Sequence, residues 1–178
     1  MREVIRPLIP AEEIARRVEE IAGDITRDHE GRIVTLICVL KGGVIFMVDL
    51  SRKLNLPVEF DFMDISSYGN GVVPGGVIKI DKDLENPITG KYVILVEDII
   101  DSGRTLSHLS KHLNAQKPAS LKICTLLDKK SRREVYDVIP DYIGFEIPDE
   151  FVVGYGLDYA QKYRNLAYIG ILEFIEGE

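Results

Sequence analysis

Carboxylates, hydroxyl groups and a glycine are concentrated in one short segment, Glu97 to Thr105, with the sequence EDIIDSGRT. Its carboxylates can accept hydrogen bonds from sugar hydroxyl groups or bind a hard cation such as Mg²⁺. The hydroxyls of Ser102 and Thr105, with Gly103 between them, suit an anion, because a helix begins here and its first turn offers free amide groups. The segment therefore predicts a site for a phosphorylated ribose and a metal ion.

A simpler interpretation is an acidic turn that caps a helix, with Asp101 or Ser102 as the capping residue. A cap needs one acidic or hydroxyl residue, and this segment has several, so we favour the ligand site. The glycine spacing matches neither a dinucleotide-binding fingerprint nor a P-loop.

The elements on either side of this segment explain how it would be positioned. Val93 to Val96 is a continuous apolar run, which is typical of a parallel strand covered on both faces. Leu106, Leu109 and Leu113 follow at helical spacing. Because open α/β sheets bind ligands at the carboxyl ends of their strands, the carboxylates are expected at such an edge.

The same arrangement occurs earlier in the chain. Ile33 to Leu40 is a second apolar run, followed by Lys41, Gly42 and a helical pattern. Glycine lets a ligand approach the backbone amides, and Lys41 brings positive charge to the same edge of the sheet. A tight turn with an exposed lysine remains an equal alternative at this position.

Other apolar or alternating runs at residues 58–65, 77–80, 121–127 and 166–172 predict further strands, and the spacing of apolar residues over 11–28 predicts a surface helix. Strands and helices that alternate in this way indicate an α/β domain with a mostly parallel sheet.

Composition limits the class of protein. The 178 residues are 46% hydrophobic, which suits one compact domain, and the net charge of −7 argues against a nucleic-acid partner. Cys38 and Cys124 lie in apolar runs and are expected to be reduced, buried thiols. Without a signal-peptide pattern or a membrane span, we expect a cytoplasmic protein that does not bind membranes.

The segment VEDIIDSGRTL resembles the phosphoribosyl pyrophosphate motif of type I phosphoribosyltransferases, in the form found in the hypoxanthine-guanine branch. Later segments extend the resemblance over most of the chain. It implies a three-layer, Rossmann-like fold in a single domain, 1–178, with helices on both faces of the sheet. The core would span about 30–140, and a small hood would come from the N-terminal segment and about 141–178.

The resemblance also implies a reaction. A 6-oxopurine, hypoxanthine and also guanine, would take the 5-phosphoribosyl group from phosphoribosyl pyrophosphate, giving IMP or GMP and pyrophosphate with the help of Mg²⁺. The family assembles as homodimers or homotetramers. Two alternatives stay open: a guanine- or xanthine-preferring enzyme, and a regulator with this fold that binds nucleotide or RNA, against which the acidic balance argues.

The family's contacts to phosphoribosyl pyrophosphate correspond here to Lys41, Gly42, Glu97, Asp98, Asp101, Ser102, Gly103, Arg104, Thr105 and Arg164. By the same resemblance the peptide bond from Leu40 to Lys41 is cis. Glu97, Asp98 and Asp158 would hold the metal ion, and Asp101 is the candidate catalytic base near N7 of the purine.

The purine site corresponds to four further positions. Lys129 would donate to the exocyclic oxygen of the base, Phe151 would stack on its ring, Val152 would pair with its edge through backbone groups, and Asp158 would help position it. From the residues alone, a basic turn explains Lys129 and core packing explains Phe151 and Val152 about as well.

Residues 66–76, SSYGNGVVPGG, form a glycine-rich stretch. The resemblance assigns it to a flexible lid loop with Ser67 and Tyr68 at its tip, which would close over the reacting centre and exclude water. Val72 to Gly75 depart from the family pattern, in which small hydroxyl residues are commoner here. An ordinary hairpin connection is the alternative.

Overall fold

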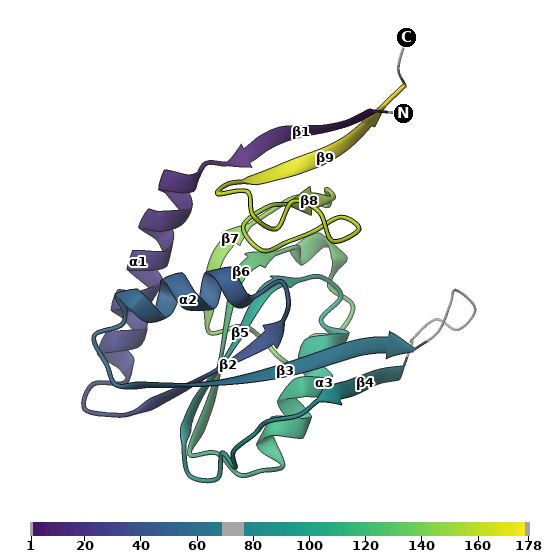
Figure 1. Ribbon diagram of the computed structural model, residues 1–178. Coiled ribbons are helices and arrows are strands. Elements are labelled where there is room, and N and C mark those ends of the chain that lie inside the picture. Colours follow the sequence, from purple (N-terminus) through teal and green to yellow (C-terminus); the bar gives the residue numbers. More distant parts are fainter. Residues whose placement is uncertain (1, 69–76, 177–178) are drawn as a thin grey trace.

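A six-stranded sheet forms the centre of the molecule (Figure 1), in a computed structural model that describes residues 2–68 and 77–176. The strand order is β4-β3-β2-β5-β6-β7. The strands are β2 (Val34–Leu40), β3 (Val58–Tyr68), β4 (Val77–Lys82), β5 (Tyr92–Ile100), β6 (Ser120–Asp128) and β7 (Tyr142–Glu146). β4 is antiparallel to β3 and the other neighbours are parallel, which confirms the predicted mostly parallel sheet.

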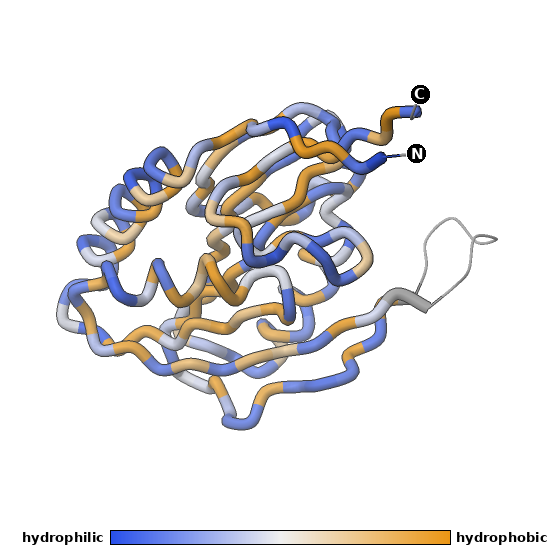
Figure 2. Tube along the Cα trace, turned by 45° about the horizontal axis from the view of Figure 1, so that its top comes forward, coloured by the Kyte–Doolittle hydropathy of each residue, from blue (hydrophilic) through white to orange (hydrophobic). Residues whose placement is uncertain are grey.

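Helices cover both faces of this sheet. α1 (Ala11–Asp28) and α2 (Val44–Lys53) pack against one face, and α3 (Arg104–Asn114) packs against the other (Figure 1). Each helix buries a stripe of apolar residues at helical spacing, as in α1 with Ile14, Val18, Ile21 and Ile25. Figure 2 shows the same division, with hydrophobic residues turned toward the sheet and hydrophilic ones outward along α1.

The central strand β5 is longer than the apolar run that predicted it. It continues through Ile100, with Glu97 opposite Thr125 and Ile99 opposite Leu127 of β6. Glu97 and Asp98 therefore lie inside the strand, where pairing with β6 continues after pairing with β2 has ended at Val96.

A second, three-stranded sheet joins the two ends of the chain, in the order β1-β9-β8. β1 (Arg2–Ile9) pairs antiparallel with β9 (Ile169–Ile175), which pairs with β8 (Val152–Val153). Arg2, near the start of the chain, is consequently paired with Ile175, near its end (Figure 1). Residues 142–146, which we expected in the hood, form β7 and belong to the large sheet instead.

The first residues of the expected lid loop belong to a strand. β3 continues through Tyr68, and Ser67 and Tyr68 pair with Ile78 and Val77 of β4. Both residues are thus in a strand and not at the tip of a loop, because β4 returns directly beside them. The remainder of the predicted lid, residues 69–76, lies outside the described residues.

The two cysteines are free and buried, as predicted. Burial raises the pKa of the Cys38 thiol to about 12 and raises that of Cys124 further. Among the helices of the described residues, none has the length and apolar character needed to cross a membrane.

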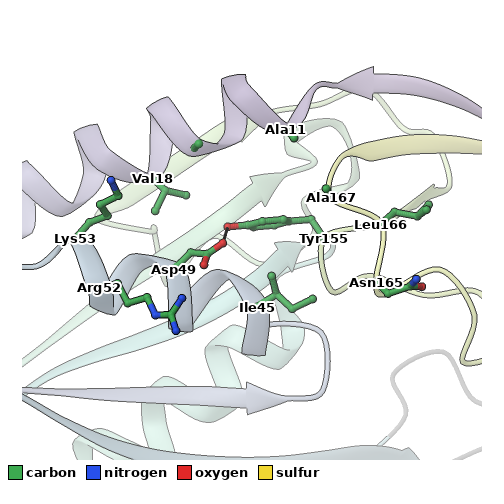
Figure 3. A pocket seen from close by; sticks show the side chains of 11 residues that line it. Ala11, Val18, Ile45, Asp49, Arg52, Lys53, Tyr155, Asn165, Leu166 and Ala167 are labelled. Carbon is green, nitrogen blue, oxygen red and sulfur yellow. Dashed lines mark hydrogen bonds between the residues drawn. The ribbon is translucent and has the colours of Figure 1, made fainter.

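A cavity of about 530 Å³ lies between α1, α2 and residues 155–167 (Figure 3). The ring of Tyr155 reaches across it, and its hydroxyl donates a hydrogen bond of 2.6 Å to Asp49 Oδ2 on α2. Burial and this bond raise the pKa of Tyr155. The backbone of Tyr155 also donates to Leu166 O, at 2.8 Å. Tyr155 thereby fastens the segment that carries Arg164 to α2.

Replacing Tyr155 with phenylalanine should lower the free energy of unfolding by about 1–3 kcal/mol, because Asp49 loses its hydroxyl partner. Denaturant unfolding measures the change. The control is Tyr136→Phe, which removes an exposed hydroxyl that donates to Arg133 O at 2.9 Å and should cost less than about 0.5 kcal/mol. Equal effects of the two substitutions would contradict the role of the Tyr155–Asp49 bond.

Candidate active site

The predicted site residues gather at the carboxyl edge of the large sheet. Because β2, β5, β6 and β7 run parallel, the segments that follow them all leave the sheet at this edge. The chain continues from β2 through α2 to β3 on one side, and from β5 through α3 to β6 on the other. The crevice between β2 and β5 is therefore the switch point at which such sheets bind ligands.

Three segments meet at the end of β2: β5, the loop after β2 and the segment after β8. They lie so close together that Gly42 and Gly156 could not carry a side chain. The Leu40–Lys41 peptide bond is cis, as the family resemblance implied. A Cβ atom on Gly42 would lie 1.7 Å from Asp98 Oδ2, and one on Gly156 would lie 2.1 Å from Gly42 O. Glycine at both positions lets β5, the loop after β2 and the segment after β8 touch.

Arg164 and Lys41 come together beside this contact. The guanidinium of Arg164 donates to Gly156 O at 2.8 Å and pairs with Asp158 Oδ1 at 2.9 Å. Gln161 Oε1 accepts from Arg164 Nη2 at 3.3 Å and from Lys41 Nζ at 3.4 Å. Gln161 had no recognisable pattern in the sequence, and the structure identifies it as the side chain that joins these two cations.

Glu97 and Asp98 are carboxylates in a desolvated position. Burial raises the pKa of Glu97 well above its ordinary range, and repulsion by Asp98 adds to the shift. Burial also raises the pKa of Asp98, while the Ile99 amide, 2.8 Å from Asp98 Oδ1, and the charge of Arg164 oppose the rise. Buried carboxylates with raised pKa values are typical of functional sites.

A cavity of about 250 Å³ opens in front of these carboxylates and the turn after β5. Gly103 has a φ of +85° and is the N-cap of α3, a conformation that favours glycine. Ser102, Gly103 and Thr105 line the cavity at the amino-terminal end of α3. The lining residues are Val39, Leu40, Ile65, Glu97, Asp98, Ile99, Ile100, Asp101, Ser102, Gly103, Thr105 and Leu106.

Arg104, also predicted to bind phosphoribosyl pyrophosphate, is not among these lining residues. Its Nε donates to Glu134 Oε2 at 2.8 Å, and both side chains are about half exposed. Its backbone amide lies in the first turn of α3 and donates to Ser102 Oγ at 3.4 Å.

A segment after β6, residues 129–135, holds the turn at residues 101–103 in place. Arg133 forms a buried ion pair with Asp128, and its Nε also donates to Asp101 O at 3.3 Å. The amides of Glu134 and Val135 donate to Ser102 O at 2.9 and 3.0 Å. The sequence suggested only a basic turn here. The residues around Arg133 in the sequence do not indicate that its side chain is buried.

Of the predicted purine residues, Lys129 directly follows β6, and Phe151 directly precedes β8, which begins at Val152. Lys129 is buried, and its Nζ lies 3.8 Å from Asp149 Oδ1. The Phe151 side chain is 52% exposed, so one ring face can accept a ligand, while Tyr159 packs edge-on at 5.8 Å between ring centroids. Val152 is buried in β8, where it pairs with Ile171.

The metal ligands predicted from the family do not form a complete protein site. Within residues 2–68 and 77–176, no group of three or more histidine, cysteine, aspartate or glutamate side chains is placed to hold a metal ion. Asp158 is engaged through both oxygens, with Arg164 and with the amide of Gln161 at 2.8 Å. This donor set fits Mg²⁺, which is commonly held by one or two carboxylates together with substrate phosphates.

The family model for the phosphoribosyl transferase domain matches residues 9–160. The chain belongs to the phosphoribosyltransferase family. The matched range contains the turn at residues 101–103 and the predicted purine-binding residues.

Relatives within the phosphoribosyltransferase family are similar over nearly the whole chain. Hypoxanthine phosphoribosyltransferase of Escherichia coli K12 is 51% identical over 96% of each chain, and hypoxanthine-guanine phosphoribosyltransferase of Bacillus subtilis is 48% identical over 96% of this chain and 94% of its own. The crystal structure of a hypoxanthine-guanine phosphoribosyltransferase from Bacillus anthracis superimposes with a TM-score of 0.91 at 47% identity, covering 97% of this chain and 100% of that one. The similarity confirms the predicted α/β fold and the hypoxanthine-guanine branch.

Some relatives are much longer. The bifunctional protein TilS/HprT of Listeria monocytogenes is 48% identical over 96% of this chain, which spans only 26% of that protein.

Proposed function

We propose that this phosphoribosyltransferase is a purine salvage enzyme, which transfers the 5-phosphoribosyl group from phosphoribosyl pyrophosphate to hypoxanthine and guanine. The products would be IMP or GMP and pyrophosphate. The observation that carries the proposal is the distribution of charge at the carboxyl edge of the sheet. Glu97 and Asp98 line the cavity at the α3 amino terminus, Gly42 packs against Asp98, and Lys41 and Arg164 meet beside that contact.

This distribution matches the charges of the donor substrate. Ser102, Gly103 and Thr105, with the α3 amides, would bind the 5′ phosphate. Lys41 and Arg164 would bind the pyrophosphate, for which the planar donor fork of arginine is suited. Asp98 and Glu97 would accept hydrogen bonds from the ribose hydroxyls between the two phosphate sites.

The purine would bind between Lys129 and Phe151. Lys129 can only donate hydrogen bonds, so it would pair with the exocyclic oxygen of hypoxanthine or guanine and would meet a second donor in the amino group of adenine. A site with a buried, unpaired donor discriminates strongly against such a ligand. The exposed ring of Phe151 would stack on the base, and the backbone of Val152 would bind its edge.

In the reaction, the bond from ribose C1 to the pyrophosphate oxygen breaks and a bond from C1 to the purine nitrogen N9 forms. Asp101 would accept the proton that the base releases at N7. Lys41 and Arg164 would stabilise the charge that develops on the departing pyrophosphate, and the crevice would hold both reactants in line. Mg²⁺, bound with Asp98, Glu97 or Asp158 and the substrate's own phosphates, would neutralise part of that charge.

The test is product formation from phosphoribosyl pyrophosphate with hypoxanthine, guanine, xanthine or adenine, each with Mg²⁺ and with excess chelator. We expect turnover with hypoxanthine and guanine, none with adenine, and loss of activity in chelator that added Mg²⁺ restores. Turnover with adenine alone would refute the purine assignment, and full activity in chelator would refute the metal requirement. A preference for xanthine would instead favour the alternative of a guanine- or xanthine-preferring enzyme.

We also propose that the protein works in the cytoplasm as a homodimer or homotetramer on small-molecule substrates. These proposals extend the family resemblance, and light scattering of the purified protein tests the oligomeric state.

A further inference from the structure

Four side chains of alternating charge form a row from the end of β5 to the loop after β7. We call Asp101, Arg132, Asp149 and Lys129 the charged row. Arg132 Nε lies 3.3 Å from Asp101 Oδ1, and its Nη1 lies 3.6 Å from Asp149 Oδ2. The other oxygen of Asp149 lies 3.8 Å from Lys129 Nζ. The row thus connects the proposed base with the proposed purine-selecting lysine.

Backbone hydrogen bonds hold the row in place. Lys129 N donates to Ile100 O at 2.9 Å, which fixes the end of β6 beside the end of β5, and Arg132 N donates to Lys129 O at 3.0 Å. Asp149 lies in a turn in which Glu150 N donates to Pro148 O at 2.8 Å. The four side chains therefore come from three adjacent segments whose backbones are already fixed.

Stability does not explain the row. Asp101, Arg132 and Asp149 are each about half exposed, and ion pairs at that exposure contribute only about 0–1 kcal/mol. Lys129 differs, because its side chain is only 11% exposed. In the part of the chain that the structure describes, Asp149 is the one carboxylate paired with Lys129. At 3.8 Å this pair leaves the ammonium group able to donate a hydrogen bond to a closer acceptor.

We propose that Asp149 is a positioning residue for the purine, a role that rests on the function proposed above. It holds the Lys129 ammonium at the place where the exocyclic oxygen of the base would arrive. Through Arg132 it also sets the direction of the Asp101 carboxylate. A bound purine would contact Lys129 through its exocyclic oxygen and Asp101 through N7, while Asp149 would act only through these two residues.

The substitution Asp149→Asn keeps the shape of the side chain and removes its charge. We expect the KM for hypoxanthine to rise about five- to tenfold, because Lys129 loses its charged partner, and the KM for phosphoribosyl pyrophosphate to stay unchanged. The value of kcat should change less than about threefold, because Arg132 still pairs with Asp101 through Nε. Asp149→Glu, which restores the charge, should recover most of the lost affinity. The control Glu146→Gln removes a neighbouring exposed ion pair, 2.8 Å from Lys130, and should leave all three constants unchanged.

A double variant tests whether the row acts as a unit. Arg132→Gln combined with Asp149→Asn should raise the KM for hypoxanthine no further than the more harmful single substitution, because groups that share one network are not additive. Fully multiplicative effects would refute the coupling through Arg132. Equal changes in both KM values together with a lowered Tm would indicate a merely structural role and would overturn the proposal.

Assays of the wild-type protein distinguish failure of the proposed function from failure of the positioning role of Asp149. Absence of product with hypoxanthine, guanine and xanthine would overturn the proposed function and the positioning role with it. Normal wild-type turnover combined with an Asp149→Asn variant whose KM for hypoxanthine stays within twofold would overturn the positioning role alone.

Discussion

Replacing Asp101 with asparagine should lower kcat for hypoxanthine by about a hundredfold to ten-thousandfold, the range that proton transfer by a positioned side chain contributes. The amide keeps the size of the carboxylate but cannot accept the proton from N7. The fold should be retained, because the Asp101 side chain is about half exposed and Arg132, with which it pairs, is exposed to a similar degree. Steady-state kinetics with hypoxanthine measure the loss.

The matched control is Glu134→Gln, an exposed acidic residue that pairs with Arg104 beside the same turn. It carries the same change of charge without the proposed chemistry, and its kcat should stay within about threefold of the wild type. Turnover of Asp101→Asn at the wild-type rate would show that another group accepts the proton.

Replacing Gly156 with alanine should lower the free energy of unfolding by about 3 kcal/mol and abolish most activity. Its φ is +105°, and an added Cβ would lie 2.1 Å from Gly42 O, a backbone atom that cannot move away without displacing Lys41 and Asp98. The same substitution would disturb Gly156 O, which accepts from Arg164 at 2.8 Å. Denaturant unfolding and turnover are the two measurements.

Gly23→Ala supplies the control for this substitution. Gly23 lies within α1, and no atom outside the helix backbone and its chain neighbours lies within 4 Å of an added Cβ. This change should raise stability by about 0.5–1 kcal/mol, because alanine favours a helix over glycine. If Gly156→Ala were as harmless as Gly23→Ala, the close contact of the three segments would not be needed for the site.

Much of the core could be predicted because its signals are local. A buried parallel strand requires an apolar run and an amphipathic helix requires apolar residues at helical spacing, so β2, β5, β6 and α1 follow from composition and periodicity. The strand boundaries were less accurate. β5 includes Glu97 and Asp98 because hydrogen bonding to β6 continues beyond the apolar run.

The errors lie where pairing with another strand decides the structure. Residues 2–9 contain no pattern that predicted a strand, and β1 forms because β9, far along the chain, pairs with it. Ser67 and Tyr68 belong to β3 because β4 returns beside them. In both places the pairing with a second strand, and not the pattern of the residues themselves, decides the structure.

The sequence by itself determined the types of chemical group at the site: carboxylates before a glycine turn, a lysine after each of two strands, and an arginine near the carboxyl end. Only the tertiary structure decided which of these groups touch. Gln161 joins Lys41 to Arg164, and Arg132 joins Asp101 to Asp149, across segments that are far apart in the chain. The physical reason is that residue type fixes charge and hydrogen-bonding capacity, whereas distance and desolvation, which set the strength of each interaction, arise only when the strands assemble.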